Sequence, residues 1–146
     1  MKLVCSPSRL AKVMKLLSPE HIEKIISDTG LGCLNMIREF KLRRIMLIRL
    51  AKSFDSETSS ITIGKTPIPI TAEDVHHIFG LAIEGEDIDE KLQSTPDPNL
   101  FNTFQHNGSI YLADLETAIL SSKTPDNDFL ARVVLFAIGA VLAPTA

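Results

Sequence analysis

Two adjacent histidines, His76 and His77, follow two acidic residues, Glu73 and Asp74, and these side chains are the best suited in the chain to metal binding or acid-base chemistry. Neighbouring residues of a helix point about 100° apart, so the two imidazoles do not converge on one ion without a third ligand. The pair also lacks the i, i+4 spacing of helical zinc sites. Because acidic residues are favoured in the first turn of a helix, we expect Glu73 and Asp74 to stabilise a helix start rather than to take part in a reaction.

The two cysteines, Cys5 and Cys33, are the other candidates for nucleophilic or redox chemistry. Two cysteines so far apart do not form a disulfide framework or a zinc knuckle, and neither has a sequence neighbour that would lower its thiol pKa. We expect free thiols in a reducing, nuclear or cytoplasmic setting. The segment 1–17 agrees with this, because it mixes basic and apolar residues and lacks the unbroken apolar core of a signal peptide.

Two further segments match ligand-binding motifs only in part. Gly64-Lys65-Thr66 matches the end of a phosphate-binding loop, but the upstream glycine and the following helix are missing. The acidic run at 84–90, EGEDIDE, lacks the alternating oxygen ligands and the closing glutamate of an EF-hand. We therefore predict no catalytic residue, no metal site, no cofactor and no small-molecule substrate, and we do not expect an enzyme.

Charge is divided unevenly along the chain. Residues 1–65 contain 12 Lys and Arg against 6 Asp and Glu, whereas residues 66–146 contain 3 against 12. We expect the two parts to attract each other, within one fold or between two copies. The alternative is a basic surface for nucleic acid, which the overall pI of about 5.8 disfavours.

The segment around the two histidines carries a complete set of helix boundary signals. Thr71 is a suitable N-cap, and Asp74 lies three residues on, where it closes a capping box. Ile70 and Val75 occupy the two positions of a hydrophobic staple. Gly80 supplies the left-handed residue that ends the helix, so the sequence predicts one short helix between Thr71 and Gly80.

Helical patterns fill much of the remaining chain. Ser6-Pro7 and Ser18-Pro19 each place an N-cap residue before a proline suited to the first helical position, so two short helices are expected to follow. From 33 to about 54 the apolar residues recur at alternating spacings of four and three, which predicts one long helix. Its basic residues form the surface assigned to the nucleic-acid alternative, namely Arg38, Lys41, Arg44, Arg49 and Lys52.

A small β-hairpin is predicted between these helical segments. Ile61 and Ile63 alternate with polar residues, Gly64-Lys65 supplies a turn, and Ile68 then alternates with two prolines. Proline has no amide proton to donate, so Pro67 and Pro69 restrict the second strand to a sheet edge.

The segment 129–143, FLARVVLFAIGAVLA, is apolar on nearly every side. It is short for a membrane span and contains Arg132, so we expect a helix buried within a helical domain rather than in a membrane. Because such a helix must be covered on several sides, we expect another protein or a second copy to cover part of it. The side chains assigned to this protein-binding surface are Val133, Phe136, Ala137 and Val141.

Three segments in this order, FDSETSSITIG, PIPITAEDVHHIFGLAIEG and FLARVVLFAIGAVLAPT, resemble the plant mobile domain, an aminotransferase-like domain of plant transposon-derived proteins. They also resemble the region that precedes a SUMO-type cysteine protease domain in plant retroelement polyproteins. Two motifs depart from the family pattern, because Ala82 follows Gly80-Leu81 where relatives have proline, and Ala143 precedes Pro144-Thr145 where relatives have cysteine.

The resemblance implies a helical interaction module that is nuclear in its relatives. Those relatives continue beyond residue 146, so it also implies that residues 1–146 are the N-terminal part of the module. The family carries an aminotransferase-like label, but no residue here supports a pyridoxal phosphate site.

Together these patterns predict a single, mainly α domain, a compact orthogonal bundle of about six helices with one small β-hairpin. Aromatic residues make up only 5% of the chain and tryptophan is absent, so the core must be built mainly from aliphatic side chains. The function we expect is a non-catalytic protein-protein interaction module of plant transposon-derived origin that self-associates or binds another protein. Nucleic-acid binding through the long helix is the alternative.

Overall fold

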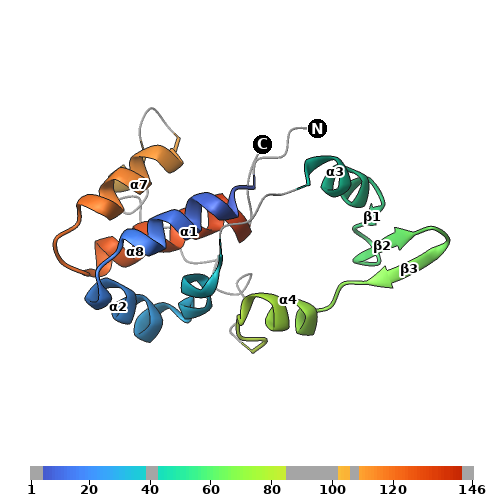
Figure 1. Cartoon of the computed structure of the whole chain (residues 1–146), viewed down its shortest axis with the longest axis horizontal. Helices are drawn as coiled ribbons and strands as arrows, with labels where there is room; N and C mark the ends of the chain where they lie inside the picture. The colour runs from blue at the N-terminus through green and yellow to red at the C-terminus, as the bar shows by residue number, and fades with distance from the viewer. Residues whose placement is uncertain (1–4, 39–42, 85–101, 106–108, 143–146) are drawn as a thin grey trace.

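The computed structural model describes residues 5–38, 43–84, 102–105 and 109–142 (Figure 1). Its elements are the helices α1 (Pro7–Leu16) and α2 (Pro19–Thr29), the 3-10 helix η1 (Gly32–Met36), α3 (Arg44–Lys52), the strands β1 (Phe54–Asp55), β2 (Ser60–Ile63) and β3 (Thr66–Pro69), and the helices α4 (Ala72–Phe79), α7 (Leu112–Ser121), α8 (Asn127–Ala137) and π-helical η2 (Ile138–Leu142). The predicted mainly α fold with a small antiparallel sheet is confirmed.

The hydrophobic core is built from the two ends of the described chain. Helices α1, α2 and η1 pack against α7, α8 and η2, and the side chains of Leu10, Ile25, Leu34, Phe129 and Phe136 are fully buried among them. The backbone N–H of Ser6 donates a hydrogen bond of 2.8 Å to the carbonyl of Ala140, which joins the start of α1 to η2. Aliphatic side chains dominate this core, as the composition predicts.

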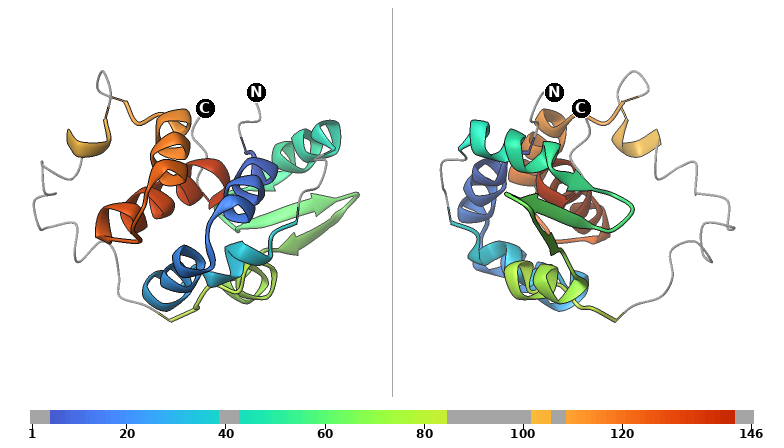
Figure 2. Two further views of the ribbon diagram at one scale, coloured as in Figure 1. Left: turned by 60° about the vertical axis from the view of Figure 1, so that its left-hand side comes forward. Right: turned by 90° about the vertical axis from the view of Figure 1, so that its right-hand side faces the viewer.

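A second region lies beside this core. We call α3, β1–β3 and α4, residues 43–80, the limb. Figure 1 shows α3 and the sheet at one end of the long axis and α7 at the other, and Figure 2 shows the hairpin reaching away from the helical core. The hydrophobic core cluster contains no residue of the limb. The limb touches the core near Cys33, because a Cβ atom added at Gly80 would lie 2.9 Å from the Cβ atom of Cys33.

The predicted helix boundaries with explicit capping residues are confirmed. In α4, the Thr71 hydroxyl accepts a hydrogen bond from the Asp74 N–H, and the Asp74 carboxylate accepts one from the Thr71 N–H. Gly80 ends the helix with a φ of 63°. Ser18 caps α2 through its side chain, whereas Ser6 precedes α1 without a side-chain hydrogen bond to the helix.

The predicted long helix from 33 to 54 is wrong. The chain forms the short η1, becomes extended at Ile37, and begins α3 only at Arg44. The tight 3-10 turn carries Leu34 into the core between α1 and α2, whereas Met36, which belongs to the expected apolar stripe, is 82% exposed. Tertiary packing of one leucine therefore overrides a helical spacing pattern that no capping residue supports.

The predicted hairpin is confirmed and acquires a third strand. The strand order is β1-β2-β3, and both neighbouring pairs are antiparallel. β3 is an edge strand, as its two prolines predict. Among the described residues, no helix has the length and apolar character needed to cross a membrane.

Candidate functional site

Each histidine of α4 forms a hydrogen bond to a backbone carbonyl, and the two rings meet edge-on with 5.5 Å between their centroids. His76 Nδ1 lies 2.6 Å from the carbonyl of Leu81, and His77 Nδ1 lies 2.6 Å from the carbonyl of Glu73. A carbonyl oxygen only accepts, so each Nδ1 carries the proton in these bonds. No cluster of three or more His, Cys, Asp or Glu residues suited to a metal ion occurs in the described parts of the chain.

A serine and a histidine lie within hydrogen-bonding distance at the start of α2. The Ser18 hydroxyl is 2.7 Å from His21 Nδ1, and the His21 ring packs edge-on against Phe129 with 4.6 Å between ring centroids. A catalytic pair needs a third group that orients the base from its other nitrogen. His21 Nε2 is buried without a hydrogen-bond partner, so we assign this pair to helix capping and core packing.

Both cysteines are partly buried and keep their protons. Burial raises the pKa of the Cys5 thiol and of the Cys33 thiol above the ordinary value. A raised pKa keeps sulfur in the unreactive thiol form at neutral pH. The two side chains are free cysteines, as predicted.

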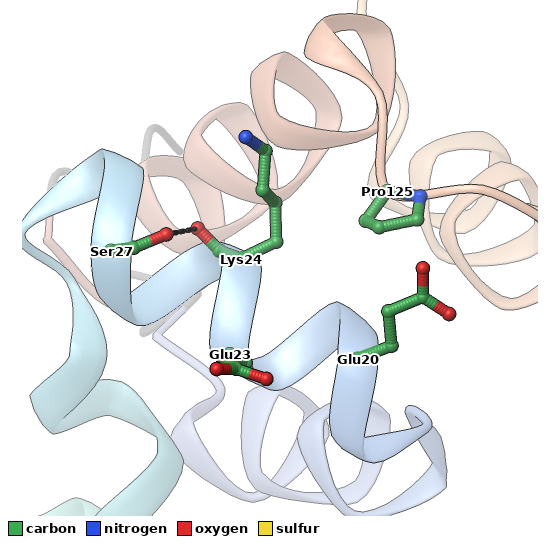
Figure 3. A pocket seen from close by; sticks show the side chains of 5 residues that line it. All are labelled: Glu20, Glu23, Lys24, Ser27 and Pro125. Carbon is green, nitrogen blue, oxygen red and sulfur yellow. Dashed lines mark hydrogen bonds between the residues drawn. The ribbon is translucent and has the colours of Figure 1, made fainter.

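An open hollow lies between α2 and the loop that precedes α8 (Figure 3). Its lining consists of Glu20, Glu23, Lys24, Ser27 and Pro125. Figure 3 shows Glu20 extending toward Pro125, and the Ser27 hydroxyl bonds to the carbonyl of Lys24. The Lys24 ammonium is paired with Asp28 at 2.6 Å, so the cation of this hollow is already engaged in an ion pair on the helix surface.

The predicted protein-binding surface on the last helix is wrong, because its side chains are buried. Phe136 and Ala137 are 0% exposed and Val133 is 2% exposed, while Val141 is half-buried against the same core cluster. Helices α1, α2 and α7 surround α8 and its extension, so this apolar segment is covered by its own chain. Val133, Phe136 and Ala137 therefore belong to the core and are not exposed to a partner, and Val141 packs against the same core.

The predicted basic surface on a long helix is also wrong, because the chain does not form that helix. Arg38 is exposed but lies before the break, whereas Arg49 and Lys52 are exposed on the last turn of α3. Lys41 and the side chain of Arg44 lie outside the described residues. The described basic side chains therefore do not form one continuous helical stripe.

More than half of the large exposed hydrophobic side chains of the described residues lie in a region that the sequence prediction missed. Of the 16 large hydrophobic side chains exposed in the described residues, 9 fall between Ile45 and Ile83, within the limb or just after it. Large exposed patches of this kind are typical of interaction sites. The alternation of Ile61, Ile63 and Ile68 was the available signal, but alternation shows only that a strand has an apolar face, not whether another element covers it.

The register of the sheet gathers apolar residues on one face. Directly paired residues of antiparallel strands point to the same side, and Phe54 pairs with Ile61, Ile61 pairs with Ile68, and Ile63 pairs with Thr66. We call Phe54, Ile61, Ile63 and Ile68 the apolar sheet face. Phe54 is 45%, Ile63 56% and Ile68 46% exposed, so the protein itself leaves about half of each side chain in water.

The opposite face of the same sheet has a different character. It carries Asp55, Ser60, Thr62, Pro67 and Pro69. Ser60 is buried, and its hydroxyl lies 2.8 Å from that of Thr58. The sheet is therefore apolar on one side and polar on the other, and most residues of both sides are exposed to water.

Charged side chains lie at the two ends of the sheet. Lys65 lies in the turn between β2 and β3, while Asp55 and Glu57 lie at the other end, beside the turn between β1 and β2. Hydrogen bonds from the Glu57 N–H and the Thr58 hydroxyl lower the pKa of Asp55, which keeps that carboxylate ionised. Opposite charges thus flank the apolar sheet face along the strand direction.

Comparison with known protein families matches residues 3–146 to a domain of unknown function, DUF8566. The chain belongs to this family. Because the match spans both the core and the limb, the apolar sheet face is part of the DUF8566 domain and not of a flanking segment. No curated protein and no solved structure matches the chain. The resemblance to the plant mobile domain stays a prediction.

Proposed function

We propose that this DUF8566 domain is a non-catalytic protein-interaction module that docks through its limb, with the apolar sheet face at the centre of the contact. The observation that carries the proposal is the apolar sheet face, on which Phe54, Ile63 and Ile68 remain about half exposed to water. Full burial of one such side chain contributes roughly 1.5 to 3 kcal/mol, so a partner that covers the face gains a substantial free energy of binding.

The small size of the sheet supports the same proposal. Its longest strands have four residues, and β1 has two. Isolated sheets of this size are marginally stable unless another element covers their apolar side. A protein partner that supplied this cover would stabilise the limb as well as bind to it.

Nucleic-acid binding is a weaker candidate. Affinity for a phosphate backbone grows with the number of basic side chains that reach it together. The break between η1 and α3 separates Arg38 from Arg49 and Lys52 along the chain, which removes the continuous stripe on which that alternative depended. The plant transposon-derived origin and the nuclear or cytoplasmic location stay predictions from the resemblance and the sequence.

Site-specific photo-crosslinking in cells tests the proposed function. A photoreactive amino acid is placed at Ile63, on the apolar sheet face, and in a matched variant at Thr62, on the opposite face. We expect crosslinked protein adducts, either with another protein or with a second copy, from position 63 and much less adduct from position 62. Absence of adducts at Ile63 and also at Ile68, in protein shown to be folded, would overturn the proposal.

A further inference from the structure

The outer edge of β3 cannot accept a partner strand by ordinary ladder pairing. The N–H of Ile70 donates a hydrogen bond of 2.8 Å to Ser59, so Ile70, and by alternation Ile68, direct their backbone groups toward β2. Pro67 and Pro69 are then the residues whose backbone faces the open edge, and neither has an N–H. The edge offers acceptors without donors, which opposes strand addition at β3 and favours docking on the sheet face.

The charges at the two ends of the apolar sheet face are complementary between two copies of the chain. Lys65 and Glu57 lie at opposite ends of β2, and neither forms an ion pair with another described residue. A two-fold axis running across the strands places the two faces against each other with their strands antiparallel. Lys65 of each copy then lies at the same end as Glu57 of the other, whereas an axis along the strands would bring like charges together.

We propose, building on the proposed function, that the partner is a second copy of this chain, and that two apolar sheet faces stack in this antiparallel two-fold arrangement. Sheets that pack face to face are about 10 Å apart, a spacing that buries side chains such as Phe54, Ile63 and Ile68 between them. The polar reverse sides and the proline-blocked β3 edges stay outside, so the contact closes at two copies and does not extend into a fibre.

The proposed dimer is weak, because the sheet is small. Four-residue strands span only about 13 Å, so the contact belongs to the small, transient class of interfaces. We therefore expect the monomer to dominate at about 10 µM and the dimer to be populated toward 1 mM.

Sedimentation equilibrium of the purified full chain across this concentration range tests the proposal. Ile63→Asp, which puts a charge in the apolar sheet face, is expected to weaken self-association by at least about tenfold. Thr62→Asp is the matched control, because it introduces the same charge on the opposite face, and self-association should stay within about twofold of the unmodified chain. Far-ultraviolet circular dichroism of each variant checks that the helical core is intact.

A charge exchange tests the antiparallel orientation independently of the apolar substitutions. Lys65→Glu and Glu57→Lys lie in exposed turns, and each alone should weaken the dimer by about three- to tenfold at low salt. The double variant should recover most of the loss, since the two positions are too far apart to pair within one copy. Failure of this recovery would overturn the orientation and with it the proposed dimer.

The outcomes also separate this inference from the proposed function. A chain that stays monomeric up to 1 mM but gives crosslinks from Ile63 to another protein would overturn the second copy as partner and leave the interaction module standing. A monomeric chain without such crosslinks would overturn both. Self-association that Ile63→Asp and Thr62→Asp reduce equally would place the contact elsewhere and overturn the stacked-face dimer.

Discussion

At the scale of single residues, two helix caps use the same chemistry in different surroundings. The Asp126 carboxylate accepts a hydrogen bond of 2.8 Å from the Phe129 N–H at the start of α8, a core helix, whereas Thr71 caps α4, in which no residue is buried. Removing each cap separately tests whether the limb and the core unfold together.

We predict that Asp126→Ala lowers the free energy of global unfolding by about 1 kcal/mol, the usual contribution of an N-cap. Thr71→Ala should cost α4 a similar amount, but as a local effect, because α4 contributes no side chain to the core. Urea midpoints should therefore shift for Asp126→Ala alone, while amide exchange should accelerate within α4 for Thr71→Ala. A shift of the global urea midpoint in Thr71→Ala would show that α4 unfolds together with the core.

Asp74 gives the start of α4 a defined pH dependence. The hydrogen bond from the Thr71 N–H, followed by the bond from the Thr71 hydroxyl, lowers the pKa of Asp74 in the folded protein. A carboxyl group with a lowered folded pKa stabilises the fold above its unfolded pKa of about 3.9, and this contribution is lost as the pH falls through the lowered value.

We predict that the helical Cα chemical shifts of α4 move toward random-coil values as the pH is lowered from 5 to about 2. Asp74→Asn should start with less helix at pH 5 and show a smaller further change, because it has no charge to lose. The shifts of α8 serve as the internal control. An equal acid response of α4 in the asparagine variant would exclude Asp74 as its cause.

At the scale of elements, Gly80 joins the end of α4 to the core. Its φ of 63° favours glycine, and a Cβ atom there would lie 2.9 Å from the Cβ atom of Cys33. Gly64 in the hairpin turn has a similar φ of 67° but open space around it. The two positions therefore share the backbone requirement and differ only in the close contact.

We predict that Gly80→Ala displaces α4 from Cys33, whereas Gly64→Ala imposes only the left-handed strain of about 1 kcal/mol on the turn. Because burial raises the pKa of the Cys33 thiol, displacement should speed its alkylation at pH 7.5 by several-fold. Alkylation of Cys33 in Gly64→Ala should stay at the original rate. Equal rates in both variants would show that α4 does not cover Cys33.

Elements with local boundary signals were predicted well, and elements defined by spacing alone were not. Thr71, Asp74 and Gly80 act through hydrogen bonds and backbone angles within a few residues, so their effect is readable in the sequence. The break after η1 depends on the packing of Leu34 into the core between α1 and α2, and no capping residue or other local pattern contains that information.

The two candidate binding surfaces, on segment 129–143 and on the hairpin, show the same limit of prediction from local sequence patterns. The apolar segment 129–143 was correctly predicted as needing cover, but its cover is α1, α2 and α7 of the same chain. The hairpin was correctly predicted as amphipathic, yet its apolar side faces water. Sequence patterns identify which surfaces are apolar, whereas the identity of the covering surface is a property of the tertiary fold.

At the scale of the whole molecule, the core and the limb make separate contributions. The core cluster draws on residues before 38 and after 103, and Ser60 is the one described limb residue that is buried. The helices of the core therefore contain the contacts needed for cooperative unfolding without the limb.

We predict that a chain lacking residues 43–84 keeps a cooperative urea transition with nearly the same midpoint and a smaller m-value, because less surface is exposed on unfolding. The same chain should lose the crosslinks and the self-association attributed to the limb. Near-ultraviolet circular dichroism and tryptic stability report whether its core stays packed. A broad, uncooperative transition would show that the limb is required for the core.

The bond between Ser6 and Ala140 also has a consequence for how the protein emerges from the ribosome. Helix α1 is complete at Leu16, but α8, against which the core is built, is complete only at Ala137. At translation rates of about 5 to 20 residues per second, α1 and α2 wait roughly 6 to 24 seconds for their packing partner. During that interval the apolar sides of the first two helices are exposed on a nascent chain, where they are natural targets for chaperones.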